Sequence, residues 1–199
     1  MDRRKLMKGG LAALAGSSVI SAGAAFAAEA DSRQRLVRIA KRALGQHTAQ
    51  IPFQDRVGLA DFSAPSWRPR FHLVDMTSGK VSSFLVAHGR GSDPRHTGLL
   101  QKFSNRPGSN ATSAGAYRTD AEYVGKYGRS MRLEGLDPEN SNAYARAIVI
   151  HAAWYVGDEM IEKYGKLGRS EGCFAFCEDD RNEVLARLGE GRLLYAGKF

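Results

Sequence analysis

The sequence has few cysteines and no dense cluster of basic residues. Cys173 and Cys177 are its two cysteines among 199 residues, so a core, rather than a disulfide framework, must hold the fold together. The net charge is +8, but no run of five or six basic residues occurs. Without a basic stripe interleaved with aromatic residues, we expect no nucleic-acid partner.

Beyond its N-terminus, the sequence also lacks internal repeats and apolar runs long enough to span a bilayer. Residues 1–27 combine a basic start, an apolar stretch of small residues and an A-x-A pattern ending at Ala27. These features predict a signal peptide, and Arg3-Arg4 resembles a twin-arginine signal. A general secretory signal and a membrane anchor are the alternatives. We expect export to the periplasm of a Gram-negative bacterium, without stable membrane insertion after cleavage.

The remaining chain divides into a lead-in segment, residues 28–69, and a candidate catalytic domain, residues 70–199. Residues 32–45 have the apolar spacing of an amphipathic helix. Short apolar runs between glycine-rich turns predict a fold that is mainly β with peripheral helices (α+β), in a single domain. The expected strands are 71–76, 81–88, 116–119, 130–133, 146–151 and 192–196, and the expected helices are 158–164 and 179–188.

One cysteine and one histidine have the context of a nucleophile and its base. Cys173 follows Gly172, and glycine lets successive backbone N–H groups point at one spot, as an oxyanion hole requires. His151 ends an apolar run that can present it on a rigid strand. A cysteine attacks as its thiolate, which a neighbouring imidazole favours.

Two other uses of these side chains stay open. Cys173 and Cys177 could form a disulfide, although the loop that it closes is small and gains little entropy. His88, His151 and a cysteine could bind zinc, but no compact pair such as H-x-x-x-H is present. We predict no metal and no cofactor, and a Cys173 that stays free in the active protein.

Several motifs together resemble the murein L,D-transpeptidase catalytic domain family, whose fold is YkuD-like. The resemblance spans about residues 70–197. The segments that carry it are His88-Gly89-Arg90-Gly91-Ser92, Phe103-Ser104-Asn105 with Gly108-Ser109, Ser113-Ala114-Gly115-Ala116-Tyr117, Arg132-Leu133-Glu134-Gly135-Leu136-Asp137, Arg146-Ala147-Ile148-Val149-Ile150-His151 and Gly168-Arg169-Ser170-Glu171-Gly172-Cys173.

The resemblance implies acyl transfer on peptidoglycan stem peptides, with Cys173 as nucleophile and His151 as a base oriented by a backbone carbonyl. The backbone N–H groups of Glu171, Gly172 and Cys173 would stabilise the oxyanion. The thiolate would attack the L,D bond after the diamino acid, and an amine of another stem would take the acyl group. If water takes it, the enzyme is an L,D-carboxypeptidase. An alternative of another class is a non-catalytic peptidoglycan-binding protein, and no oligomeric state is predicted.

The sequence departs from the common family pattern in three ways. Ala152 replaces the glycine after the base, Glu171 replaces a histidine before Gly-Cys, and Phe174-Ala175 replace a nearby Arg or Asn. These departures leave the contact to the substrate carboxylate unassigned. Arg169 or Arg90 could supply it, because a guanidinium forks onto a carboxylate, and the alternative for both is a surface or structural arginine. The candidate substrate-binding residues are Arg169, Ser170, Arg90, His88 and Tyr117.

Overall fold

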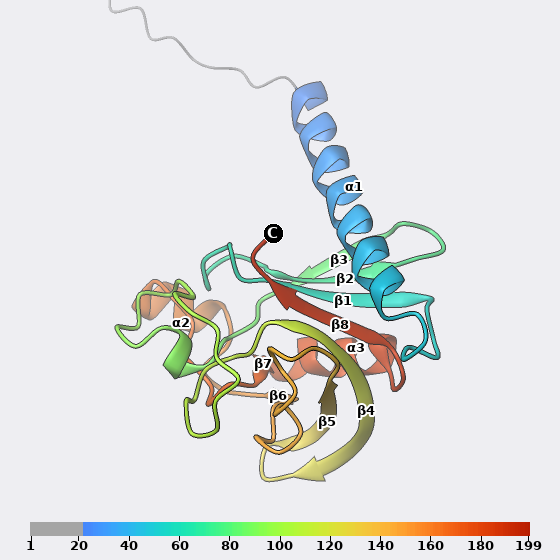
Figure 1. Cartoon of the computed structure of the whole chain (residues 1–199). Coiled ribbons are helices and arrows are strands. Elements are labelled where there is room, and N and C mark those ends of the chain that lie inside the picture. The colour runs from blue at the N-terminus through green and yellow to red at the C-terminus, as the bar shows by residue number, and fades with distance from the viewer. Residues whose placement is uncertain (1–21) are drawn as a thin grey trace, which may run out of the picture.

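The computed structural model describes residues 22–199, so most of the predicted signal peptide lies outside the described residues (Figure 1). No helix in the described range is both long and apolar enough to cross a membrane. The elements are α1 (Ala22–Gln46), β1 (Arg56–Asp61), β2 (Phe71–Asp75), β3 (Val81–Phe84), the 3-10 helix η1 (Arg90–Ser92), β4 (Gly115–Gly125), β5 (Gly128–Gly135), β6 (Val149–Ala152), α2 (Asp158–Tyr164), β7 (Phe174–Phe176), α3 (Glu178–Leu188) and β8 (Leu193–Gly197).

All eight strands form one mixed sheet in the order β3-β2-β1-β8-β4-β5-β6-β7. The pairs β1–β8 and β6–β7 are parallel, and the other neighbours are antiparallel. The sheet is strongly curved, and the long β4–β5 hairpin curls round below it (Figure 1). The chain that leaves β3 reaches the opposite edge, where the Ala87 N–H donates to the Ala175 carbonyl of β7 at 2.8 Å. This contact brings the segment after β3 beside the strand that follows Cys173.

Each face of the sheet is covered by its own helix. The C-terminal half of α1 buries an i, i+4, i+7, i+8 set of side chains against β1, β2 and β8, while its N-terminal half projects away from the sheet (Figure 1). The other face carries the larger core, which α3 closes with Val184, Leu185 and Leu188. The α1 residues of the first cluster are Leu36, Ala40, Ala43 and Leu44.

The predicted fold class is confirmed, and most predicted elements are present. Helix α2 has the predicted bounds, α3 begins one residue earlier, and the expected strands at 81–88 and 146–151 are shorter than predicted. Strands β1 and β7 are not predicted from the sequence. Strand β1 is buried on both faces and shows no alternation, and β7 has only three residues. Because β1 lies between β2 and β8, the sheet begins before the predicted boundary at residue 70.

Candidate active site

The register between β6 and β7 brings Cys173 and His151 to one face of the sheet. His151 pairs with Ala175, and Cys173 lies two residues before Ala175. Side chains two residues apart in an extended chain point the same way. Phe174 and Ile150 point to the opposite face and are fully buried in the core. Both functional side chains line one cavity of about 340 Å³.

The His151 ring is held in the orientation that a base requires. Its Nδ1 lies 2.8 Å from the Ala152 carbonyl. Because a carbonyl only accepts, Nδ1 carries the proton and Nε2 keeps a lone pair. The Tyr127 ring stacks on the imidazole with centroids 4.6 Å apart. Burial lowers the pKa of His151 below its usual 6.5, so the imidazole is neutral at neutral pH.

The Cys173 thiol is protonated in the resting site. Burial is the main cause that raises its pKa above the usual 9.0; the Glu171 carboxylate adds to the rise, and a Val149 backbone hydrogen bond opposes it. Within residues 22–199 the thiol group itself donates to the Ala147 carbonyl, at 3.5 Å, and not to the imidazole. Ala147 has a φ of +52°, an uncommon backbone conformation for a residue with a Cβ.

Glycines let the segment before Cys173 pack backbone to backbone against the chain after β3. Ser170 exchanges hydrogen bonds with this chain: its N–H donates to the His88 carbonyl at 2.9 Å, and its carbonyl accepts from Arg90 at 2.8 Å. A Cβ on Gly89 would lie 2.8 Å from the Gly172 backbone. Two glycines facing each other therefore fix how close the nucleophile segment lies to its neighbour.

Gly172, whose N–H is one of the three predicted oxyanion-hole donors, already uses that N–H in a hydrogen bond within the turn. Gly172 has a φ of +125°, which a residue with a Cβ rarely adopts. Its N–H donates to the Ser170 hydroxyl at 3.2 Å, and that hydroxyl donates to the Cys173 carbonyl at 2.7 Å. Through these two hydrogen bonds the Ser170 side chain stabilises the turn formed by residues 170–173. Gly172 would have to release Ser170 before its N–H could meet a substrate oxygen.

Arg146 braces the other wall of the cavity. One terminal nitrogen donates to the Ser104 carbonyl and the Ser113 hydroxyl, both at 2.7 Å. The other donates to the Ala111 carbonyl and the Ser109 hydroxyl. Its two terminal nitrogens are therefore committed to the loop 104–113 and hold that loop against the cavity.

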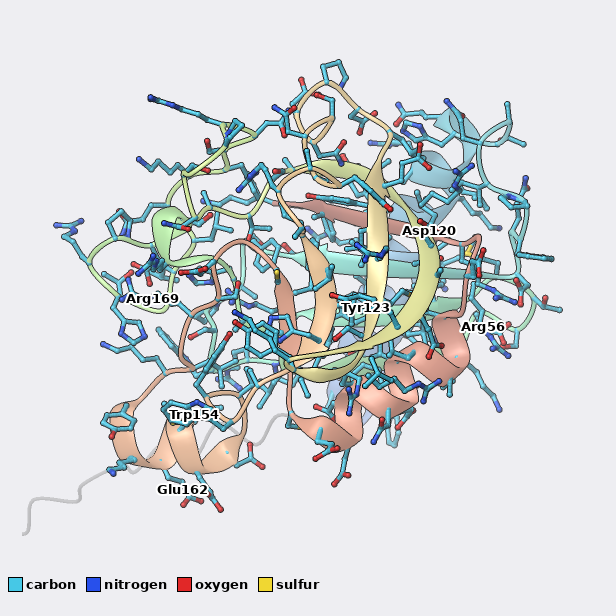
Figure 2. All side chains as sticks on the ribbon, turned by 90° about the horizontal axis from the view of Figure 1, so that it is seen from below. Arg56, Asp120, Tyr123, Trp154, Glu162 and Arg169 are labelled. Carbon is cyan, nitrogen blue, oxygen red and sulfur yellow. The ribbon has the colours of Figure 1, made fainter. Side chains whose placement is uncertain are left out.

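Of the candidate carboxylate-binding residues, Arg90 and Arg169 both lie close to the nucleophile segment. Arg90 pairs with the Glu171 carboxylate at 2.9 Å, and both side chains are more than half exposed. Arg169 lines the cavity, and one of its terminal nitrogens donates to the Asp93 carbonyl. In Figure 2, Arg169 lies beside the loop that carries η1, while Trp154 lies next to α2. Arg169 is thus the candidate guanidinium in the wall of the cavity.

His88 and Tyr117, also candidate substrate-binding residues, are buried among protein groups. The His88 Nδ1 accepts from the buried Arg70 at 2.7 Å, and its Nε2 lies 3.6 Å from an Asp93 oxygen. Burial and the Arg70 charge lower the pKa of His88 to about 3. Tyr117 is fully buried, and its hydroxyl donates to the Ser113 carbonyl at 2.9 Å. Both side chains support the loops around the cavity.

The strand between the two cysteines excludes a disulfide within the chain. Residues 174–176 form β7, and four extended residues span about 13 Å. A disulfide needs Cα atoms less than about 7 Å apart. Both thiols are free. Within residues 22–199, no cluster of three or more His, Cys, Asp or Glu side chains could hold a metal ion.

Five cavity residues were not identified from the sequence as site residues, and one of them is Ala147, whose carbonyl accepts from the Cys173 thiol. Lys126 and Tyr127 come from the turn of the β4–β5 hairpin, far in sequence from either motif. Their turn reads as an ordinary surface loop, so the sequence carries no signal for them. Arg146 and Tyr155 flank the β6 run on either side, and that proximity to His151 is a signal that could have found them.

The raised pKa of Cys173 predicts a specific pH dependence of alkylation. A thiol with a pKa above 9 is mostly protonated at neutral pH, so its reaction with iodoacetamide should keep accelerating as the pH rises through 9. The measurement uses a Cys177→Ser variant, so that Cys173 is the one reactive thiol. A rate that levels off below pH 7 would indicate a thiolate–imidazolium pair and contradict the neutral pair described above.

Comparison with known proteins gives one family. A sequence model described as the L,D-transpeptidase catalytic domain matches residues 29–196. Among solved structures, L,D-transpeptidases from Mycobacterium smegmatis and Xylanimonas cellulosilytica are each 12% identical, with TM-scores of 0.43 and 0.44. The matches cover 72% and 71% of this chain, and 58% and 60% of the respective solved chains. No curated protein sequence matches.

Proposed function

The chain belongs to the L,D-transpeptidase catalytic domain family, and on that premise we propose that it is a cysteine acyltransferase that crosslinks peptidoglycan stem peptides. The observation that carries the proposal is the cavity in which Cys173 and an oriented, neutral His151 lie on one face of the sheet. The donor would be a stem tetrapeptide that ends in a D-residue. We further propose that the enzyme acts outside the cytoplasm, as its N-terminal sequence predicts.

The chemistry begins with proton transfer from the Cys173 thiol to His151 Nε2. A rotation of the thiol away from the Ala147 carbonyl would direct its proton to the imidazole. The sulfur then attacks the carbonyl carbon of the L,D bond, and backbone N–H groups next to Cys173 stabilise the oxyanion. The C–N bond breaks, and His151 returns its proton to the departing amine. A thioester on Cys173 remains.

The second half of the reaction decides between transfer and hydrolysis. If an amine of a second stem attacks the thioester, the product is a crosslink; if water attacks, it is a trimmed tripeptide. Both outcomes use the same acyl-enzyme, so L,D-carboxypeptidase activity is the second candidate function. The cavities that continue beyond Glu171 favour transfer, because they leave space for a second peptide.

Product analysis separates these functions. We expect purified protein incubated with disaccharide tetrapeptide to release the terminal D-residue and to form crosslinked dimers, both detected by mass spectrometry. Tripeptides without dimers would assign the protein as a carboxypeptidase. Binding of the substrate without any product would leave only a peptidoglycan-binding role.

A further inference from the structure

Two neighbouring cavities share a wall that contains Glu171. One is the cavity of Cys173 and His151; the second has about 280 Å³, and Arg146 and Glu171 line both. The guanidinium of Arg146 is committed to the loop 104–113. The Glu171 carboxylate is 68% exposed and directly precedes Gly172-Cys173 in the chain. It is therefore the accessible negative charge between the nucleophile and the second cavity.

Cationic side chains lie on both sides of this carboxylate, and Lys126, Arg146 and Arg169 line the cavity of Cys173 itself. A third cavity of about 440 Å³ shares Pro107 and Gly108 with the second and is lined by the cations Lys102 and Arg106. Both of these side chains belong to exposed residues. Glu171 is therefore the one carboxylate among the residues that line these three cavities, and their other charged side chains are cations. A ligand that complements this arrangement carries an amine at Glu171 and carboxylates toward the surrounding cations.

We propose that Glu171 binds the ammonium group of the acyl acceptor, a diamino-acid side chain on a second, anionic stem peptide, and guides it to the acyl-enzyme. This inference rests on the proposed function and adds a specificity residue to it. Arg90 is the matching positioning residue, because its pairing with Glu171 at 2.9 Å holds the carboxylate at the cavity rim.

The reaction step balances with groups that the site contains. The bound ammonium first loses a proton to water, and the neutral amine attacks the carbonyl carbon of the thioester. The new C–N bond forms, the C–S bond breaks, and the sulfur leaves as thiolate. The remaining surplus proton on nitrogen passes to His151 and then to the sulfur, which restores the neutral pair.

The test compares how the acyl-enzyme divides between acceptors. Wild-type protein and a Glu171→Gln variant receive disaccharide tetrapeptide as donor, with a tripeptide bearing a side-chain amine as charged acceptor or hydroxylamine as a largely uncharged one. The product ratio of transfer to hydrolysis does not depend on how fast the acyl-enzyme forms. This matters because loss of the Glu171 charge also lowers the pKa of Cys173. The matched control is Glu162→Gln, an exposed substitution on α2 (Figure 2).

We expect Glu171→Gln to lower the ratio for the charged acceptor by about two- to fivefold, the size expected for an exposed ion pair, and to leave the hydroxylamine ratio unchanged. Glu162→Gln should leave both ratios unchanged. An unaltered ratio for the charged acceptor, or an equal fall for both acceptors, would overturn the proposal while leaving acyl transfer intact. Failure of the wild-type protein to release the D-residue would instead remove the proposed function, and this proposal with it.

Discussion

Replacing Cys173 with alanine should abolish both D-residue release and crosslinking, by at least about three orders of magnitude, without unfolding the protein. The acyl-enzyme needs a sulfur at this position, and Cys177 cannot replace it because β7 carries that thiol about 13 Å away. The measurement is product formation from disaccharide tetrapeptide, with the mass of the trapped acyl-enzyme as a second readout. Alanine removes a single partly buried sulfur from the cavity wall, so the melting temperature should change little.

Two further variants test whether Cys177 and His151 take part in the reaction. Cys177→Ser should keep its activity, since that thiol lies beyond β7 and outside the cavity. His151→Gln should lower the rate of acylation by about 100-fold or more, because the thiol then loses its base. Full activity in Cys173→Ala would remove the thioester mechanism, whereas full activity in His151→Gln would reassign only the base.

The candidate nucleophile and base were easier to predict from the sequence than the other residues that line the cavity. Cys173 and His151 could be singled out because glycines precede one and an apolar strand leads to the other. The two side chains lie on the same face of the sheet because of how β7 pairs with β6, and β7 is a three-residue strand that no sequence pattern indicates. Lys126 and Tyr127 reach the cavity because the β4–β5 hairpin curves, and its register shift between Thr119 and Glu122 has no recognisable sequence pattern.

The buried polar residues show a second limit of sequence reasoning. His88, which begins a glycine-rich motif, and Tyr117 are both predicted from the sequence to bind substrate. In the structure both side chains are enclosed, while the glycine next to His88 makes the contact with the nucleophile segment. A motif of mixed residue types shows that a region is constrained, but burial decides which of its members face the ligand.

Gly89→Ala should therefore be the second variant with a very large effect on activity, although residue 89 is not expected to touch substrate. The added Cβ would overlap the Asn110 carbonyl oxygen and lie 2.8 Å from the Gly172 Cα and N. All of these atoms belong to backbone and cannot rotate away, so the turn that carries Cys173 must shift. A displacement of about 1 Å in a reacting group can cost about 100-fold in rate, and such overpacking costs about 1–3 kcal/mol of stability.

The matched control for this substitution is Gly45→Ala in α1, where a new Cβ meets no atom within 4 Å. Alanine there should leave activity unchanged and stabilise the helix by up to about 1 kcal/mol. Rates of tetrapeptide turnover and urea unfolding curves for both variants separate the two effects. If Gly89→Ala loses stability but keeps wild-type turnover, close packing of Gly89 on Gly172 supports the fold only. If turnover falls far more than the fraction of folded protein, that packing sets the position of the sulfur.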